Sequence, residues 1–73
     1  MGRLRVLSGR EVCRILEAQG FVEVRRRGSH IVMQQRTQSG TITVPIPDHL
    51  ELAIGTLLSI IRQSRVPRSL FEE

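Results

Sequence analysis

Three short segments rich in β-branched residues follow one another in the middle of the chain, with only glycine-containing turns between them. They are FVEVRR at 21–26, HIVMQQ at 30–35 and TITVPI at 41–46. Because such segments between turn residues are typical of strands, they predict three consecutive β-strands. Pro45 and Pro47 have no backbone donor, so the third strand is expected at an edge of the sheet.

The two turns predict which residues share a face of this sheet. A Gly28-Ser29 turn would place Arg27 opposite His30, and therefore Val24 opposite Met33. A turn over residues 37–40 would place Met33 opposite Val44, and Ile31 opposite Ile46. Directly opposed residues share a face, so both turns predict the same antiparallel meander. Its apolar face would carry Val22, Val24, Ile31, Met33, Ile42, Val44 and Ile46, and its open, polar face Glu23, Arg25, Arg27, His30, Val32, Gln34, Thr41 and Thr43.

Helices are predicted on both sides of the strand region. Ser8 and Glu11 have the spacing of a capping box, which predicts a helix over about residues 9–19, with Gly20 as its stop signal. A second helix is predicted over about residues 54–63, from an apolar stripe of Ile54, Leu57, Leu58 and Ile61.

After the second helix, Pro67 is placed to begin a last short turn, with Leu70 and Phe71 as packing residues. The order α-β-β-β-α predicts an α+β fold. We expect a two-layer sandwich in which both helices cover the apolar face of a three-stranded antiparallel sheet.

Length and composition narrow the classes of protein that this chain can belong to. Its 73 residues predict a single domain, residues 1–73, with a small core. No apolar run is long enough to span a membrane. A single cysteine, Cys13, suits a reducing compartment, so a cytoplasmic location is expected. The net charge of +4, carried by eleven basic residues that are all arginine, favours a polyanionic partner such as nucleic acid.

The hexapeptide RRRGSH, residues 25–30, is the one stretch that suggests chemistry. Histidine titrates near neutrality, so His30 could give or take a proton of an RNA 2′-hydroxyl or leaving group. Arg25 and Arg27 could hold the phosphate, and the Gly28-Ser29 turn would let its backbone and hydroxyl reach it. The same residues could equally form an inert hairpin end, whose charges prevent edge pairing. The residues alone leave both interpretations open.

No metal or cofactor is expected. One cysteine and two histidines that lie far apart in sequence, with Asp48 as the only nearby carboxylate, do not make a ligand set. His49 is expected to be a capping or surface residue, and Cys13 a small core residue.

The chain resembles a known family along most of its length. The segments LSGREVCRILEAQGF, RRRGSHIVM, TITVPIPDH, IGTLLSIIRQS and VPRSLFEE are similar, in this order, to the HicA family of bacterial toxins. The resemblance implies a small endoribonuclease that cleaves mRNA, the toxin of a type II toxin–antitoxin system, with a fold like a double-stranded-RNA-binding domain. It also implies a HicB-like antitoxin as partner.

The resemblance assigns the catalytic role to His30 of the Gly28-Ser29-His30 motif, without metal or cofactor. Gly55-Thr56 matches the start of the family's second helix. The pattern departs from the family at residues 47–49, where many members have a histidine or glycine directly after the third strand. No role is therefore transferred to His49.

Two other functions remain open at this stage. The first is a non-catalytic RNA-binding module of the same fold, which would read RNA shape through phosphate and 2′-hydroxyl contacts. Such domains need a basic start to the second helix, whereas AIGTLLSII has no cation before Arg62. The second is a purely protein-binding subunit, which would have no affinity for RNA.

Overall fold

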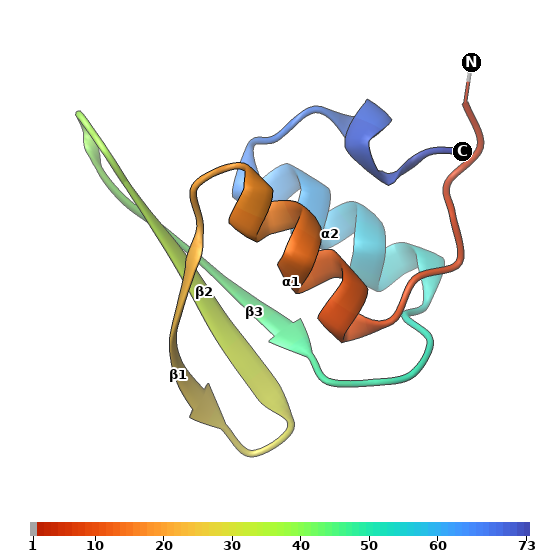
Figure 1. The fold of residues 1–73 in the computed structure, drawn as a ribbon, viewed down its shortest axis with the longest axis horizontal. Coiled ribbons are helices and arrows are strands. Elements are labelled where there is room, and N and C mark those ends of the chain that lie inside the picture. The colour runs from red at the N-terminus through yellow and green to blue at the C-terminus, as the bar shows by residue number, and fades with distance from the viewer. Residues whose placement is uncertain (1) are drawn as a thin grey trace.

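The computed structural model describes residues 2–73 and confirms the predicted α+β fold and element order. The elements are α1 (Gly9–Ala18), β1 (Val22–Arg27), β2 (His30–Thr37), β3 (Gly40–Pro47), α2 (Ile54–Ser64) and a 3₁₀ helix, η1 (Arg68–Phe71). The sheet is antiparallel with the order β1-β2-β3, and both helices lie on the same side of it (Figure 1). Within the described residues, no helix has both the length and the apolar character needed to cross a membrane.

The start and end of α1 confirm the signals read from the sequence. The Ser8 hydroxyl accepts a hydrogen bond from the Glu11 amide, and the Glu11 carboxylate accepts one from the Ser8 amide. These two bonds satisfy donors that a helix start otherwise leaves free. At the other end Gly20 has a φ of +99°, and the Phe21 amide donates to the Leu16 carbonyl. A glycine takes this left-handed conformation without steric cost, so it ends the helix here.

The predicted β2–β3 register is confirmed, because Met33 lies opposite Val44 and Ile31 opposite Ile46. β3 is an edge strand, as Pro45 and Pro47 predicted.

The predicted β1–β2 register is right only next to the turn. Arg27 lies opposite His30, but the pairing shifts by one residue between Glu23 and Arg25, so Met33 faces Glu23 instead of Val24. An extra residue of this kind is a β-bulge, which changes the face of everything beyond it.

Because of the bulge, the faces predicted for three residues of β1 are wrong. Val22 lies opposite Gln34 on the open face, and both Val22 and Val24 are exposed rather than part of the core. Glu23 lies opposite Met33 on the helix side, where its charge acts on Cys13 and Arg10 of α1.

The second helix also buries a different stripe from the predicted one. Leu57 and Ile60 are buried together with Ser64, whereas Ile54 and Leu58 are exposed and Ile61 is half-buried. The core joins both helices, the helix side of the sheet and the C-terminal segment, where Phe71 is fully buried and Leu70 packs against it as predicted. Its buried members are Leu7, Val12, Cys13, Leu16, Phe21, Ile31, Met33, Val44, Ile46, Leu52, Leu57, Ile60 and Phe71.

The start of α1 lies unusually close to the segment that follows β3. The Gly9 amide donates to the His49 carbonyl over 2.9 Å, and the Leu52 amide donates to the Leu7 carbonyl over 2.9 Å. A Cβ atom on Gly9 would be 1.9 Å from the Pro47 carbonyl oxygen, so only glycine permits this approach. The contact fixes the 48–53 loop against the start of α1.

Candidate nucleic-acid interface

On the open face of the sheet, the part nearer the β1–β2 turn is an array of nine residues in three cross-strand rows. The row next to the β1–β2 turn contains Arg27, His30 and Pro47, and the next contains Arg25, Val32 and Pro45. Beyond the bulge, the third row contains Val22, Gln34 and Thr43. Since residues that oppose one another share a face, His30 has Arg27 and Pro47 as lateral neighbours.

The Gly28-Ser29 turn brings His30 to this position. Gly28 has a φ of +58°, and Arg65 is the one non-glycine residue of residues 2–73 with a positive φ, so Ser29 has a negative one. Glycine at the first of two central positions is the pattern of a tight hairpin turn whose twist matches the strands. The Ser29 carbonyl accepts a 2.7 Å hydrogen bond from the Asp48 amide, which holds the turn against the 48–53 loop.

A shallow pocket of about 400 Å³ opens on this face beside His30. Val32 forms its floor and is only 5% exposed, although it points to the solvent side of the sheet. Its cross-strand neighbours Arg25 and Pro45 stand on either side and account for this shielding. The lining is completed by Arg27, His30 and Thr43. The pocket therefore has an apolar floor and a basic rim.

No carboxylate lies in the nine-residue array, because the bulge moves Glu23 to the other side of the sheet. Arg25 and Arg27 are exposed, and the ion pairs found within residues 2–73 involve other arginines. Two guanidinium groups without a protein counter-charge, one beside His30 and one beside Val32, make this face suited to phosphate.

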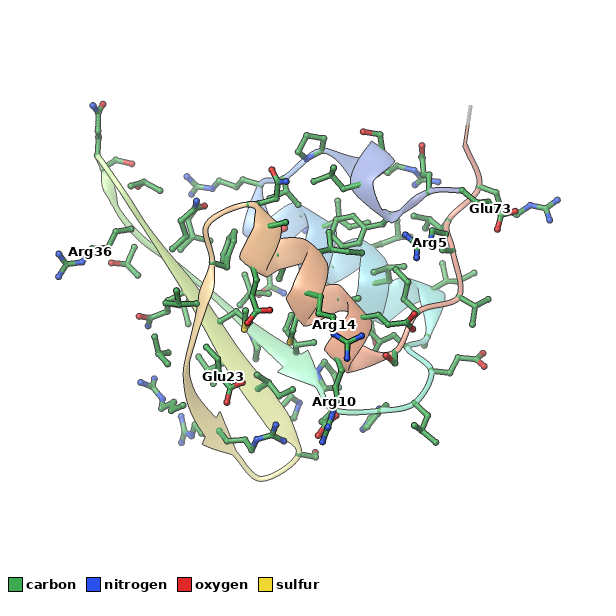
Figure 2. All side chains as sticks on the ribbon, in the orientation of Figure 1. Arg5, Arg10, Arg14, Glu23, Arg36 and Glu73 are labelled. Atoms are coloured by element: carbon green, nitrogen blue, oxygen red, sulfur yellow. The ribbon has the colours of Figure 1, made fainter. Side chains whose placement is uncertain are left out.

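Arg26, between these two arginines, has a different environment. It lies opposite Ile31 on the helix side, and its Nη1 atom is 2.9 Å from an Asp48 carboxylate oxygen. Arg10 of α1 contacts the other oxygen of the same carboxylate through Nε at 3.1 Å. Figure 2 shows Arg10 at the end of α1 that lies nearest the β1–β2 turn.

Asp48 thus joins α1, β1 and the turn that carries His30. Hydrogen bonds from Arg10 and Arg26 hold the pKa of the Asp48 carboxyl below its usual value. The carboxylate is charged at neutral pH, so both contacts persist there. We interpret Asp48 as the residue that positions the turn, rather than as a metal ligand.

The structure brings together all five residues that the sequence suggested for the site. Arg25, Arg27 and His30 line the pocket, and Gly28 and Ser29 form the adjacent turn. Their roles stay predictions.

Sequence reasoning missed Thr43 and Pro45 of β3 as pocket residues, although the predicted register already placed Thr43 on the His30 face. It also missed the link through Asp48, whose partners lie 22 and 38 residues away in sequence.

The other reactive side chains lie apart from this face. Cys13 is buried, and burial raises the pKa of its thiol to about 11. Cys13 is therefore a core residue, as the sequence predicted. His49 is exposed in the 48–53 loop and does not line the pocket. Within residues 2–73, histidine, cysteine and acidic side chains form no group of three or more that could hold a metal ion.

Fold and site together define a class: a small basic α+β protein with a histidine and unpaired arginines on the open face of its sheet. The sequence model of one family, described as the HicA toxin of bacterial toxin–antitoxin systems, matches residues 9–66. The match spans both helices and all three strands, so the chain belongs to the HicA toxin family and is the toxin of a toxin–antitoxin system. No curated protein matches the chain significantly.

Proposed function

We propose that this toxin is an endoribonuclease that cleaves mRNA, with His30 as its proton-transfer group. The observation that carries the proposal is the position of His30 on the rim of an open pocket. It lies beside Arg27, with Arg25 in the next row, and the surrounding array contains no carboxylate. A substrate of this kind would be met in the cytoplasm, which agrees with the reducing environment suggested by the free Cys13.

The reaction needs one proton-transfer group and a cationic phosphate site from this face, and solvent water for the second proton transfer. The RNA 2′-oxygen forms a bond to the neighbouring phosphorus, the bond from phosphorus to the 5′-oxygen breaks, and the products end in a 2′,3′-cyclic phosphate and a 5′-hydroxyl. One proton leaves the 2′-hydroxyl and one is supplied to the 5′-oxygen, and His30 would carry out one of these transfers. Arg25 and Arg27 would stabilise the charge that develops on the phosphate oxygens.

The test compares the two histidines of the chain. His30→Ala should reduce the rate of RNA cleavage about 10²–10⁴-fold, the usual contribution of a general acid or base. Both histidines are exposed, so neither truncation opens a core cavity, and each should change the free energy of unfolding by less than about 1 kcal/mol. His49→Ala is the matched control and should cleave RNA at the wild-type rate. A folded His30→Ala protein with full activity would refute the assignment.

The same assay addresses the role of metal. We propose a metal-independent reaction, so wild-type cleavage should continue in excess chelator. Loss of activity in chelator, with recovery on addition of a divalent ion, would show the mechanism to be wrong.

We further propose that the partner antitoxin is HicB-like and inhibits by covering the open face. Amide exchange in the complex would then slow in β1, in the β1–β2 turn and at the β3 edge. Protection confined to α2 and the C-terminal segment would mean that inhibition is indirect. Arg36, near the β2–β3 turn at the far end of the sheet (Figure 2), is a reference position outside the pocket.

A further inference from the structure

The pocket contains side chains that a phosphate-binding site does not require. Phosphate binding needs cations and donors, which Arg25, Arg27 and the turn provide at the surface. The pocket adds an apolar floor, Val32, and an apolar wall, Pro45, neither of which can contribute to anion binding. Its volume of about 400 Å³ lies within the range of small-ligand pockets, about 300–1,000 Å³. The part of an RNA chain that suits such a surface is a base.

The polar groups at the pocket match a base edge. The side-chain amide of Gln34 donates to the Thr43 hydroxyl oxygen over 3.1 Å, so the hydroxyl hydrogen is free to be donated to a ligand. On the other side, the planar guanidinium group of Arg25 can stack on a base. Stacking on phenylalanine, tyrosine or tryptophan is not available here, because the only such residues, Phe21 and Phe71, are both buried in the core.

A base in an intact duplex could not enter this pocket, because its faces are covered by its neighbours in the stack. Duplex recognition would instead use phosphates and 2′-hydroxyls along a basic helix. The only basic residue of α2 is Arg62 in its last turn, and its exposed residues near the start include Ile54. The basic surface next to His30 is the sheet, a surface on which other proteins bind single strands.

We propose that the pocket binds one unstacked base of single-stranded RNA, next to the phosphate that His30 and Arg27 contact. The proposal rests on the proposed function for the identity of the polymer, and it adds the substrate class. The base lies over Val32 between Arg25 and Pro45, with its edge at Thr43. Cleavage is then directed to unpaired regions of an RNA, because a paired base cannot occupy the pocket.

The binding test uses single-stranded 2′-O-methyl oligonucleotides, which lack the attacking hydroxyl and stay intact on wild-type protein. One base at a time is removed to leave an abasic sugar, and the affinities are compared with those of the full oligonucleotide and its duplex. Removal of the base in the pocket should weaken binding at least about fivefold, since a stacked base contributes that much or more. The duplex should bind at least about tenfold more weakly than the single strand at the same salt concentration.

A protein variant locates the base. Thr43→Val keeps the shape of an exposed, β-branched strand residue and removes only the hydroxyl, so the fold is retained. It should weaken binding of the full oligonucleotide about two- to tenfold, the range of one hydrogen bond, and leave binding of the matching abasic oligonucleotide unchanged. Arg36→Ala is the control. It lies on the same face of β2, six residues or roughly 20 Å from His30, and should weaken both oligonucleotides equally.

The outcomes separate this inference from the proposed function. RNA cleavage together with equal affinity for abasic, full and duplex oligonucleotides would overturn the base pocket and leave the nuclease intact. Base-dependent binding in which Thr43→Val and base removal are coupled, but without any RNA cleavage, would support the pocket and overturn the nuclease. Absence of binding to every oligonucleotide would overturn the pocket, and absence of RNA cleavage as well would overturn both.

Discussion

Replacement of Gly9 by alanine should destabilise the protein, although alanine is the better helix former. The new Cβ atom would lie 1.9 Å from the Pro47 carbonyl oxygen, whereas nonbonded heavy atoms normally keep about 3.5 Å. The start of α1 and the end of β3 would have to separate by roughly 1.5 Å. Two backbone hydrogen bonds cross this contact, from Gly9 to His49 and from Leu52 to Leu7, and both would lengthen or break.

The magnitude follows from these terms. Overpacking costs about 1–3 kcal/mol, and each lost hydrogen bond about 0.5–1.5 kcal/mol. The gain in helix propensity offsets up to about 1 kcal/mol. The free energy of unfolding should therefore fall by about 1–6 kcal/mol, out of a total of about 4–11 kcal/mol for 73 residues. The melting temperature should drop by at least about 5 °C.

The chain contains a matched control for this substitution. Gly55 lies in the first turn of α2, and a Cβ atom there would have no neighbour within 4 Å. Gly55→Ala should therefore stabilise the protein by up to about 1 kcal/mol, or leave its stability unchanged. The two variants carry the same chemical change and differ only in what the methyl group meets.

Thermal and urea unfolding, followed by circular dichroism, would measure both variants, and amide exchange would localise the effect. In the Gly9→Ala variant, exchange should accelerate at the amides of residue 9, Asp48 and Leu52, which bond within or beside the contact. A Gly9→Ala protein as stable as the wild type would refute the reasoning. A fall in stability of both variants alike would show that glycine acts through chain flexibility rather than through the close approach.

Three further predictions concern other residues. Because its hydrogen bonds lower the pKa of Asp48 in the folded state, this carboxylate stabilises the protein above its unfolded pKa of about 3.9, and the contribution is lost as pH falls through the lower, folded pKa. Asp48→Asn should therefore flatten the acid side of the stability–pH curve, and a curve parallel to that of the wild type would contradict the Asp48 contacts. Because burial raises the pKa of Cys13 to about 11, alkylation at pH 8 should be at least about 100-fold slower in the folded than in the unfolded protein, and equal rates would show that the thiol is accessible. Because Leu57 is buried and Leu58 is exposed, Leu57→Ala should lower the free energy of unfolding by about 2–5 kcal/mol and Leu58→Ala by less than about 1 kcal/mol. The reverse order would contradict the stripe that the structure buries.

The elements and most of the site were predictable because their signals are local. The capping box of α1 and the Gly28-Ser29 turn each depend on a few adjacent residues, so their geometry follows from the sequence with little help from the rest of the chain. That turn alone is enough to place Arg25, Arg27 and His30 on one face, because all three lie before the bulge is reached.

Farther from the turn, the prediction was wrong, because a bulge leaves no local signal. VEV reads as a regular strand with a buried valine on each side of a polar residue, yet the structure exposes both valines. The bulge places Glu23 on the helix side, near Arg10. The stripe on α2 was similarly ambiguous, since the apolar residues cover about half of the helix circumference and more than one rotation buries a similar set.

The sequence by itself determined the order of the elements, the hairpin that presents His30 and the excess of positive charge. Each of these depends on residues close together in the chain or on their sum. Only the tertiary structure decided that Val32 is the floor of a pocket, that the open array holds no carboxylate and that Asp48 holds the turn against α1. These features arise between residues more than twenty positions apart or across strands, and they exist only once the helices, the bulge and the 48–53 loop have packed together.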